Sequence, residues 1–183
     1  MNIAANPAIE ADQTIYLKDY QKPSFVVNSI DLNIQVYDDH TLVSSKLEMQ
    51  RQTAGDLVLL GRDLELQSIQ LNGQPLNASD YILDTEQLVI SNAPDQATIE
   101  TVVKIHPETN TMLEGLYQAG DLFVTQNEPE GFRKITFYPD RPDVLSVFTT
   151  RVEADKKFPV LLANGNLIET GEAGEGRHYA IWQ

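Results

Sequence analysis

Residues 30–36 read Ile-Asp-Leu-Asn-Ile-Gln-Val, a strict alternation of apolar and polar side chains. A period of two places the apolar set on one face of an extended chain, so this stretch predicts a half-buried β-strand. Asp38-Asp39-His40 forms a turn signal, and apolar residues resume over residues 43–49. The pattern therefore predicts a β-hairpin.

A second hairpin is indicated at residues 64–76, where two apolar stretches flank Asn72-Gly73. This dipeptide readily supplies the positive φ angles of a two-residue turn. Further short apolar runs occur at residues 81–83, 88–90, 99–105, 147–152, 160–162 and 179–182, with turns expected at 164–166 and 171–176. No stretch of twelve or more residues has a helical period. The predicted fold class is all-β, an antiparallel β-sandwich or saddle.

Residues 106–146 differ in composition from the rest of the chain, because they contain four of the nine prolines among mixed aromatic and charged residues. Proline disrupts long regular elements, so we expect loops laid over the scaffold, where functional residues often lie. The sequence ends at Trp182-Gln183, inside the last predicted strand. We therefore expect either an edge strand there or a domain cut from a longer protein.

The 183 residues include 13 lysines and arginines against 27 aspartates and glutamates, a formal net charge of −14. The length is typical of one domain, which we place at residues 1–183, and a composition of 42% apolar and 22% charged residues is that of a folded protein. A sequence pI near 4.4 means that the surface repels phosphate backbones and anionic lipids. Neither nucleic acid nor a membrane is an expected partner.

Several classes of site are disfavoured by the motifs that the sequence lacks. It has no cysteine, no secretory signal in residues 1–12 and no apolar window long enough to span a membrane, which favours the cytoplasm. His40, His106 and His178 are isolated from one another, so each is interpreted as a surface or turn histidine. Gly-x-Ser-x-Gly and Gly-x-x-x-x-Gly-Lys motifs are also absent, so serine catalysis and phosphate binding are not indicated.

The remaining candidate is a carboxylate-rich stretch, Thr-Gln-Asn-Glu-Pro-Glu-Gly-Phe-Arg at residues 125–133, followed by Phe-Tyr-Pro-Asp-Arg-Pro-Asp at 137–143. Glu128 precedes Pro129, and a proline neighbour helps to hold a carboxylate in a fixed direction, where it can receive an ammonium group. The alternative is that the charged residues pair with one another and with water, and the residues alone favour it. These residues are Glu128, Glu130, Arg133, Asp140, Arg141 and Asp143.

The same region resembles the N-terminal domain of the bacterial alanyl aminopeptidases (aminopeptidase N), a gluzincin family of zinc metallopeptidases. The motifs that carry the resemblance are Leu-Glu-Gly-Leu-Tyr at 113–117, Thr-Gln-x-Glu-x-Glu-Gly-Phe-Arg at 125–133, Ile-Thr-Phe-Tyr-Pro-Asp-Arg-Pro-Asp-Val-Leu at 135–145 and Phe-Thr-Thr at 148–150. The likeness extends from Tyr20 to His178 and so covers most of the chain. Its motifs are long and occur in a fixed order, which makes the resemblance specific.

The resemblance implies a zinc-dependent enzyme of the membrane alanyl aminopeptidase type, which removes amino-terminal residues from peptides. In that family the zinc ligands lie on a His-Glu-x-x-His helix with a downstream glutamate, in the domain that follows this one. A Gly-Ala-Met-Glu-Asn segment there helps to bind substrate. None of these motifs occurs in this sequence. We therefore expect the chain to bind no zinc, to be inactive alone, and to have peptide substrates and a downstream catalytic domain of the same polypeptide as partners.

The resemblance also implies a role for individual residues of the 125–133 motif. Glu128 corresponds to a glutamate that helps to bind the α-amino group of the substrate, and Gln126 lies beside the pocket for the first side chain. An otherwise buried carboxylate gives specificity, because a blocked terminus leaves it unpaired. Asn127 and Pro129 occupy variable positions and leave the side-chain preference open. We assign no catalytic residue and no metal ligand to this chain.

The other charged residues of the stretch are expected to be structural. A buried or half-buried ion-pair network that fixes the loop is the expected role of Glu130, Arg133, Asp140, Arg141 and Asp143, since guanidinium groups suit bidentate pairing with carboxylates. The catalytic domain is expected to dock near residues 123–138. A second interpretation stays open: a stand-alone, non-catalytic β-sandwich module that binds peptide N-termini or a protein partner.

Overall fold

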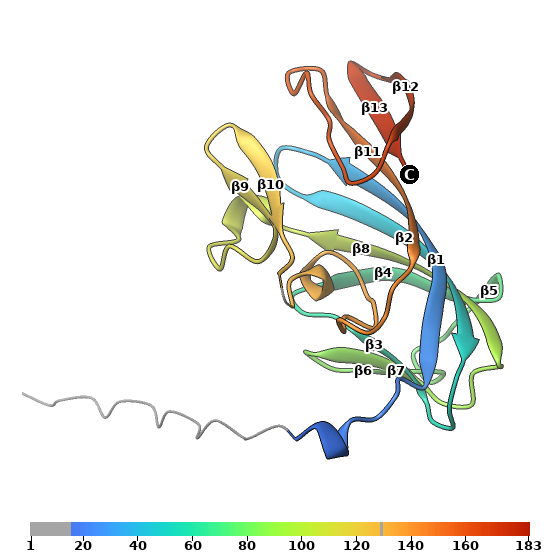
Figure 1. Ribbon diagram of the computed structural model, residues 1–183. Helices are drawn as coiled ribbons and strands as arrows, with labels where there is room; N and C mark the ends of the chain where they lie inside the picture. The colour runs from blue at the N-terminus through green and yellow to red at the C-terminus, as the bar shows by residue number, and fades with distance from the viewer. Residues whose placement is uncertain (1–15, 129) are drawn as a thin grey trace, which may run out of the picture.

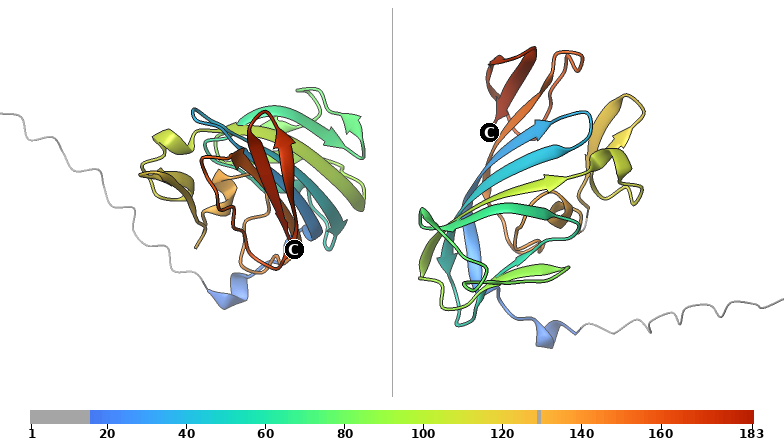
Figure 2. Two further views of the ribbon diagram at one scale, coloured as in Figure 1. Left: turned by 90° about the horizontal axis from the view of Figure 1, so that it is seen from above. Right: turned by 180° about the vertical axis from the view of Figure 1, so that it is seen from behind.

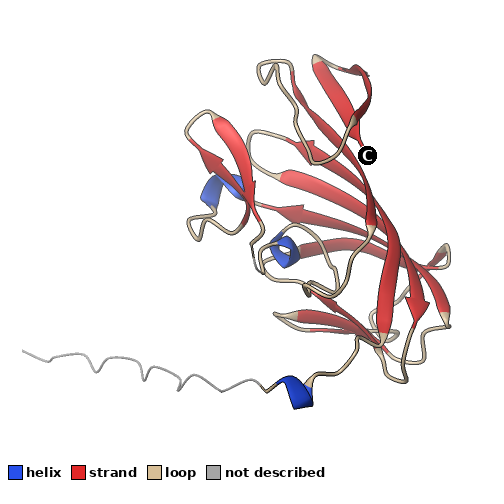
Figure 3. Ribbon diagram, in the orientation of Figure 1, coloured by secondary structure: helices blue, strands red, loops and turns tan. Residues whose placement is uncertain are grey.

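The computed structural model describes residues 16–128 and 130–183, and this part of the chain is built almost entirely from β-strands (Figures 1 and 3). Its helices are single 3₁₀ turns, η1 (Leu17–Asp19), η2 (Pro107–Thr109) and η3 (Phe132–Lys134). The strands are β1 (Phe25–Val36), β2 (Thr41–Arg51), β3 (Leu57–Leu60), β4 (Glu65–Leu71), β5 (Gln74–Pro75), β6 (Ile82–Leu83), β7 (Gln87–Ile90), β8 (Gln96–Ile105), β9 (Gly115–Ala119), β10 (Leu122–Gln126), β11 (Val147–Asp155), β12 (Leu167–Gly174) and β13 (Arg177–Trp182).

The largest element is an eight-stranded sheet in the order β12-β13-β11-β1-β2-β8-β4-β5. Neighbouring strands in it are antiparallel except for β1 and β11, which pair in parallel from Ser29 opposite Val147 to Gln35 opposite Glu153. Antiparallel sheets can bury one face and leave the other in water. Along β2 and β8 this gives a buried face that includes Val43, Leu47, Ile99 and Val103. The predicted all-β, mainly antiparallel fold is confirmed.

Both predicted hairpins form in the large sheet. β1 and β2 pair along their length, with Val36 opposite Thr41 at the turn. The β4–β5 turn has φ values of 50° at Asn72 and 75° at Gly73, the positive pair that a type I′ turn requires. Local sequence therefore accounts for the backbone of the β4–β5 turn.

Two smaller sheets lie on the buried side of the large one. One has the order β3-β7-β6, and the other is the β9–β10 hairpin. Figure 1 and the right view of Figure 2 show the segment that contains η3 between these two sheets, with β3, β6 and β7 at the end of the domain opposite β12 and β13. The hydrogen bond from the Thr136 hydroxyl to Ser45 of β2, at 3.1 Å, and a β-bridge between Leu60 and Tyr138 attach that segment to the large sheet and to β3.

Four details differ from the expectations. Residues 106–146 are not only surface loops, because they contain β9 and β10 and because Ile135, Thr136 and Phe137 are at most 2% exposed. Residues 160–162 form no strand, since no neighbouring strand pairs with them. Most of the expected 171–176 turn belongs to β12, and the turn itself is confined to residues 175–176. β3 has no counterpart among the predicted strands.

The edges of the large sheet are short or irregular. β13 lies between β11 and β12, so it is not the edge strand that the sequence suggested. The edge strand β12 has register shifts between Leu167 and Glu169 and between Glu172 and Gly174, and β5 at the other edge is two residues long and includes Pro75. Bulges and prolines of this kind weaken edge-to-edge pairing with other chains. No helix in the described part of the chain is long and apolar enough to cross a membrane.

Candidate functional site

Gln126 and Glu128 lie at the base of the β9–β10 hairpin. Gln126 is the last residue of β10 and pairs with Gly115, the first residue of β9, and Glu128 follows in the turn that leads to η3. Both side chains are exposed, so the expected burial of the Glu128 carboxylate is not found in this chain. Pro129, the neighbour expected to orient that carboxylate, lies outside the described residues.

Close packing of glycines anchors the base of this hairpin. An isolated two-stranded sheet is marginally stable, so the hairpin depends on contacts with the rest of the domain. Gly131 packs directly on the backbone of Gln126 and Asn127, and a Cβ atom on Gly131 would lie 2.8 Å from the Asn127 Cα. Gly115 has φ +70°, and a Cβ atom there would lie 2.7 Å from Cβ of Lys134. The hairpin base and η3 therefore form one tightly packed unit.

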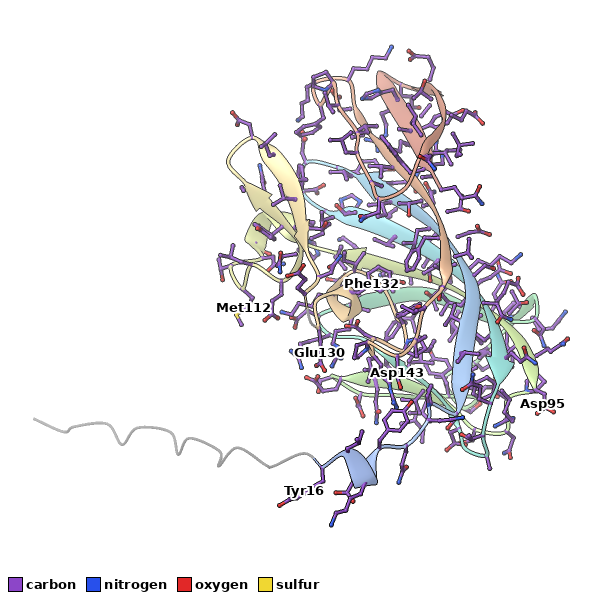
Figure 4. All side chains as sticks on the ribbon, in the orientation of Figure 1. Tyr16, Asp95, Met112, Glu130, Phe132 and Asp143 are labelled. Atoms are coloured by element: carbon purple, nitrogen blue, oxygen red, sulfur yellow. The ribbon has the colours of Figure 1, made fainter. Side chains whose placement is uncertain are left out.

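Arg133 holds η3 to the segment that follows it. Its Nε lies 3.0 Å from Oδ2 of Asp140, one terminal nitrogen donates to the Asp140 carbonyl oxygen at 2.9 Å, and the same nitrogen lies 3.0 Å from Oε2 of Glu130. The Arg133 backbone N–H also donates to the Asp140 carboxylate. In Figure 4 Glu130 lies near the outer edge of the molecule, whereas Phe132 lies over the large sheet. Arg133 thus bridges the exposed turn and the interior.

Arg141 and Asp143 form a second group, separate from that of Arg133. The Arg141 guanidinium pairs with both carboxylate oxygens of Asp143 at 2.9 and 2.7 Å, and it donates to the carbonyl oxygen of Gln21. The Tyr20 hydroxyl donates to Asp143 at 2.8 Å. Hydrogen bonds from Arg141 and Tyr20 hold the pKa of Asp143 below its usual value. The expected ion pairs are present, but as two clusters, and this one fastens the segment before β1.

Lys134 is a buried charge that the sequence reasoning did not single out. Its side chain is only 7% exposed, and its Nζ lies 3.1 Å from Oδ2 of Asp63 and 3.8 Å from Oε2 of Glu114. A buried ammonium needs such partners, because desolvation of an unpaired charge is costly. In the sequence Lys134 lies between Arg133 and a β-branched residue, a position that does not predict burial. Lys134 ties η3 to the loop after β3 and to the start of β9.

The histidines do not form a common site. His40 is hydrogen bonded to Asp39, His106 contacts Glu108 and Glu65, and His178 contacts the carbonyl oxygen of Phe158. Over residues 16–128 and 130–183, no group of three or more histidines and acidic residues is arranged to hold a metal ion. The side chains in these two described ranges therefore offer no ligand set that fits a zinc ion.

Two surface hollows lie away from Glu128. One, of about 360 Å³, is on the polar face of the large sheet and is lined by residues that include Asn33, Lys46 and Glu100. The other, of about 420 Å³, lies beside β12 and β13 and includes Leu162 and Trp182. Gln126 and Glu128 line neither hollow, so their position at the hairpin base, not a cavity, defines the candidate site.

Comparison with known proteins gives a consistent result. The model of the family described as the Peptidase M1 N-terminal domain matches residues 19–183. Aminopeptidase N of Caulobacter vibrioides is 45% identical over 176 residues, which are 94% of this chain and 20% of that protein. Aminopeptidase N of Escherichia coli K12 is 45% identical over 174 residues, 93% of this chain and 20% of that protein.

Solved structures agree with the sequence comparisons. Legionella pneumophila aminopeptidase A, solved in complex with aspartic acid, superimposes with a TM-score of 0.85 and 33% identity, covering 91% of this chain and 20% of that one. An M1 zinc metallopeptidase from Deinococcus radiodurans has the same fold at a TM-score of 0.74 and 18% identity, over 88% of this chain and 39% of that one. This chain spans about one fifth of the length of the curated relatives that it matches. The chain belongs to the Peptidase M1 N-terminal domain family.

Proposed function

We propose that this chain is the substrate-anchoring domain of a longer, zinc-dependent aminopeptidase that removes amino-terminal residues from peptides in the cytoplasm. Glu128 receives the α-ammonium group of the substrate, and Gln126 lies beside the side chain of the substrate's first residue. The family match and the aminopeptidase names of relatives with 45% identity support this proposal. The observation that carries it is an exposed carboxylate at a turn fixed by the packing of Gly131 and the buried ion pair of Arg133 with Asp140.

The charges around this turn favour an ammonium ligand. Arg133 pairs with Glu130 and Asp140, and Lys134 pairs with Asp63 and Glu114. Each cation of η3 therefore already has two carboxylate partners, and no side chain in the described part of the chain forms a hydrogen bond or ion pair with Glu128. An ammonium group brings the compensating charge and up to three hydrogen-bond donors.

Selectivity for a free amino terminus requires that Glu128 lose water when substrate binds. A carboxylate in water distinguishes charged from neutral ligands weakly, whereas a desolvated one leaves a large penalty when its partner is missing. Because Glu128 is exposed in this chain, we assign its desolvation to a further part of the polypeptide that covers the hairpin base. That part also supplies zinc, which polarises the scissile carbonyl group when bound.

The face expected to make that contact, at residues 123–138, is only partly accessible. Ile135, Phe137 and Tyr138 are buried in the core of this chain itself and are not available for docking. Exposed apolar side chains lie instead at Leu145 and Val147, next to Phe148, whose ring centroid is 5.8 Å from that of Phe132 in η3. We propose this apolar surface, together with the hairpin base, as the docking surface of the catalytic domain.

The experiment has two steps. The intact mass of the native gene product, captured from source cells with an antibody to this domain, is expected to be several times 20.5 kDa. In that product, Glu128→Gln is expected to raise KM for L-alanine p-nitroanilide by about tenfold or more, the usual effect of removing a charged hydrogen bond. Glu130→Gln, two residues away and paired with Arg133, is the matched control and is expected to change KM by less than about threefold.

Either of two outcomes overturns the proposal. A native product of about 20.5 kDa contradicts the longer enzyme and favours the stand-alone module that binds peptide N-termini or a protein partner. A longer product in which Glu128→Gln behaves like Glu130→Gln contradicts the role of Glu128. A rise in KM confined to Glu128→Gln supports it.

A further inference from the structure

Gly131 makes the closest backbone approach at the hairpin base. A Cβ atom on this residue would overlap the carbonyl oxygen of Gln126 and would lie 2.8 Å from Cα of Asn127 and 3.1 Å from the backbone nitrogen of Gly115. All three neighbours are backbone atoms, which cannot swing aside as the end of a side chain can. Its φ of −87° is open to any residue, so Gly131 is required for space and not for backbone conformation.

Gly120, in the turn of the same hairpin, has the opposite requirement. Its φ is +62°, which favours glycine, but nothing lies within 4 Å of the position that a Cβ atom would occupy. A side chain at position 120 strains the turn backbone but contacts no other segment. Alanine variants at the two positions therefore have different effects. A Cβ atom at Gly131 displaces the hairpin base, whereas one at Gly120 only weakens the hairpin at its turn.

The segment on the far side of Gly131 is firmly held. Phe132 packs edge-to-face on Tyr138 at 5.1 Å, Arg133 is bonded to Asp140, and the backbone N–H of Lys134 donates to the Gly131 carbonyl oxygen at 3.1 Å. Residues 126–128, in contrast, are exposed. A side chain at position 131 therefore has to push the exposed Gln126–Glu128 backbone outward, because η3 cannot retreat into the core.

We propose that Gly131 is a positioning residue that sets where the Glu128 carboxylate lies, by allowing η3 to pack directly on the Gln126–Asn127 backbone. This inference rests on the proposed role of Glu128 in binding the substrate ammonium group. Displacement of a binding group by about 1 Å can cost a large factor in rate or affinity. Gly131 itself touches no substrate in this proposal and acts only through Glu128.

The test is a double-mutant cycle in the native-length gene product, with L-alanine p-nitroanilide as substrate. Gly131→Ala is expected to raise KM by about tenfold with kcat changed by less than about threefold, and Gly120→Ala is expected to leave both constants near their original values. In the Glu128→Gln background, Gly131→Ala is expected to have no further effect on KM, since the group that it displaces is already lost. A merely structural role for Gly131 gives instead an additive loss.

A second measurement does not depend on activity. In the 183-residue chain, Gly131→Ala is expected to speed amide hydrogen exchange at residues 126–128 while leaving β1 and β2 unchanged, and Gly120→Ala is expected to act only near the turn. The inference is overturned if exchange at residues 126–128 is unaffected, or if KM effects are additive. If Glu128→Gln alone leaves KM unchanged, the proposed role of Glu128 fails, whereas faster exchange at 126–128 still establishes that Gly131 positions this backbone.

Discussion

The guanidinium of Arg133 meets the carboxylate of Asp140 with Nε 3.0 Å from Oδ2, and side-chain exposure is only 9% for the arginine and 15% for the aspartate. The same arginine reaches back to Glu130 in the exposed turn. One side chain thus connects the candidate site with the interior, and its removal leaves a half-buried carboxylate without its partner.

Arg133→Ala is therefore expected to lower the free energy of unfolding by about 3 kcal/mol, the scale observed when one partner of a buried ion pair is removed. Urea denaturation followed by circular dichroism measures it. Arg62→Ala is the matched control, because Arg62 and Glu86 pair at 2.7 Å with side chains 40% and 53% exposed. Exposed pairs contribute at most about 1 kcal/mol. Equal losses in the two variants would show that the Arg133 pairs have no special structural role.

Arg141 fastens the segment before β1, which includes η1. Arg141→Ala removes the bonds of Arg141 to Asp143 and to the carbonyl oxygen of Gln21. The Asp143 carboxylate, which accepts the hydrogen bond of the Tyr20 hydroxyl, is then no longer held in place. We expect faster amide exchange over residues 17–24 and a change of less than about 1 kcal/mol in unfolding free energy. Tyr20→Phe removes a single bond and is expected to have a smaller effect. Unchanged exchange over residues 17–24 in Arg141→Ala would rule out the fastening role.

Glu153 in β11 makes stability depend on pH. Burial acts to raise the pKa of Glu153, but hydrogen bonds from Arg177 and Arg151 outweigh it and hold the pKa below the ordinary value of 4.5. The ionised form is thus favoured by folding, so this stabilisation is complete above about pH 4.5 and is lost as the pH falls through the lower pKa of the folded state.

Glu153→Gln is accordingly expected to lower stability at pH 7 by about 1–3 kcal/mol and to flatten the loss of stability below about pH 4.5. Urea unfolding at a series of pH values between neutrality and strong acid tests both effects. Glu175→Gln, at an exposed turn position, serves as the control and is expected to retain the full pH dependence. A variant at position 153 with the original pH profile would contradict the assignment.

Zinc addition to the 183-residue chain is expected to give no stoichiometric binding. His40, His106 and His178 each contact different partners, and the described residues hold no cluster of three potential ligands. Structural and catalytic zinc sites need three or four such ligands in fixed geometry. Isothermal titration with zinc, followed by metal analysis of the dialysed protein, is the measurement. One tightly bound equivalent would require a site that includes residues outside the described part.

Local sequence predicted those parts of the fold that local interactions determine. The alternation at residues 30–36 and the positive φ angles of Asn72-Gly73 depend on neighbours in the chain, and both hairpins form. Residues 160–162 have strand-like side chains, but no strand pairs with them. Phe137 sits in the core although its segment has no regular period, because its burial depends on packing against distant strands. Sequence pattern carries no direct record of such contacts.

The candidate site divides in the same way. The 125–133 motif drew attention to Gln126 and Glu128, and the pairing tendency of arginine predicted ion pairs for Arg133. The burial of Lys134 and the contact of Gly131 with the Gln126 backbone arise only when β9, β10 and η3 come together. The residues proposed to bind substrate were therefore visible in the sequence, whereas those that position them required the folded structure.

Among the described residues, two buried threonines differ in hydrogen bonding: Thr136, two residues after η3, is bonded, and Thr41, at the start of β2, is not. The Thr136 hydroxyl donates to Ser45, which is also 3.1 Å from the Thr101 hydroxyl, so three buried hydroxyl groups join the η3 segment to β2 and β8. The Thr41 hydroxyl is equally buried, but no group in the described part of the chain accepts or donates a hydrogen bond to it. Both threonines are 0% exposed.

The same substitution is therefore expected to have opposite effects at these two positions. Thr136→Val removes a hydrogen bond and should lower the free energy of unfolding by about 1 kcal/mol, whereas Thr41→Val replaces an unpaired buried hydroxyl by a methyl group of similar size and should leave stability unchanged or raise it by up to about 1 kcal/mol. Because the volume change is the same, packing losses cancel in the comparison. Denaturation midpoints that shift in the same direction by equal amounts would show that the hydroxyl group of Thr136 does not help to hold the η3 segment on the sheet.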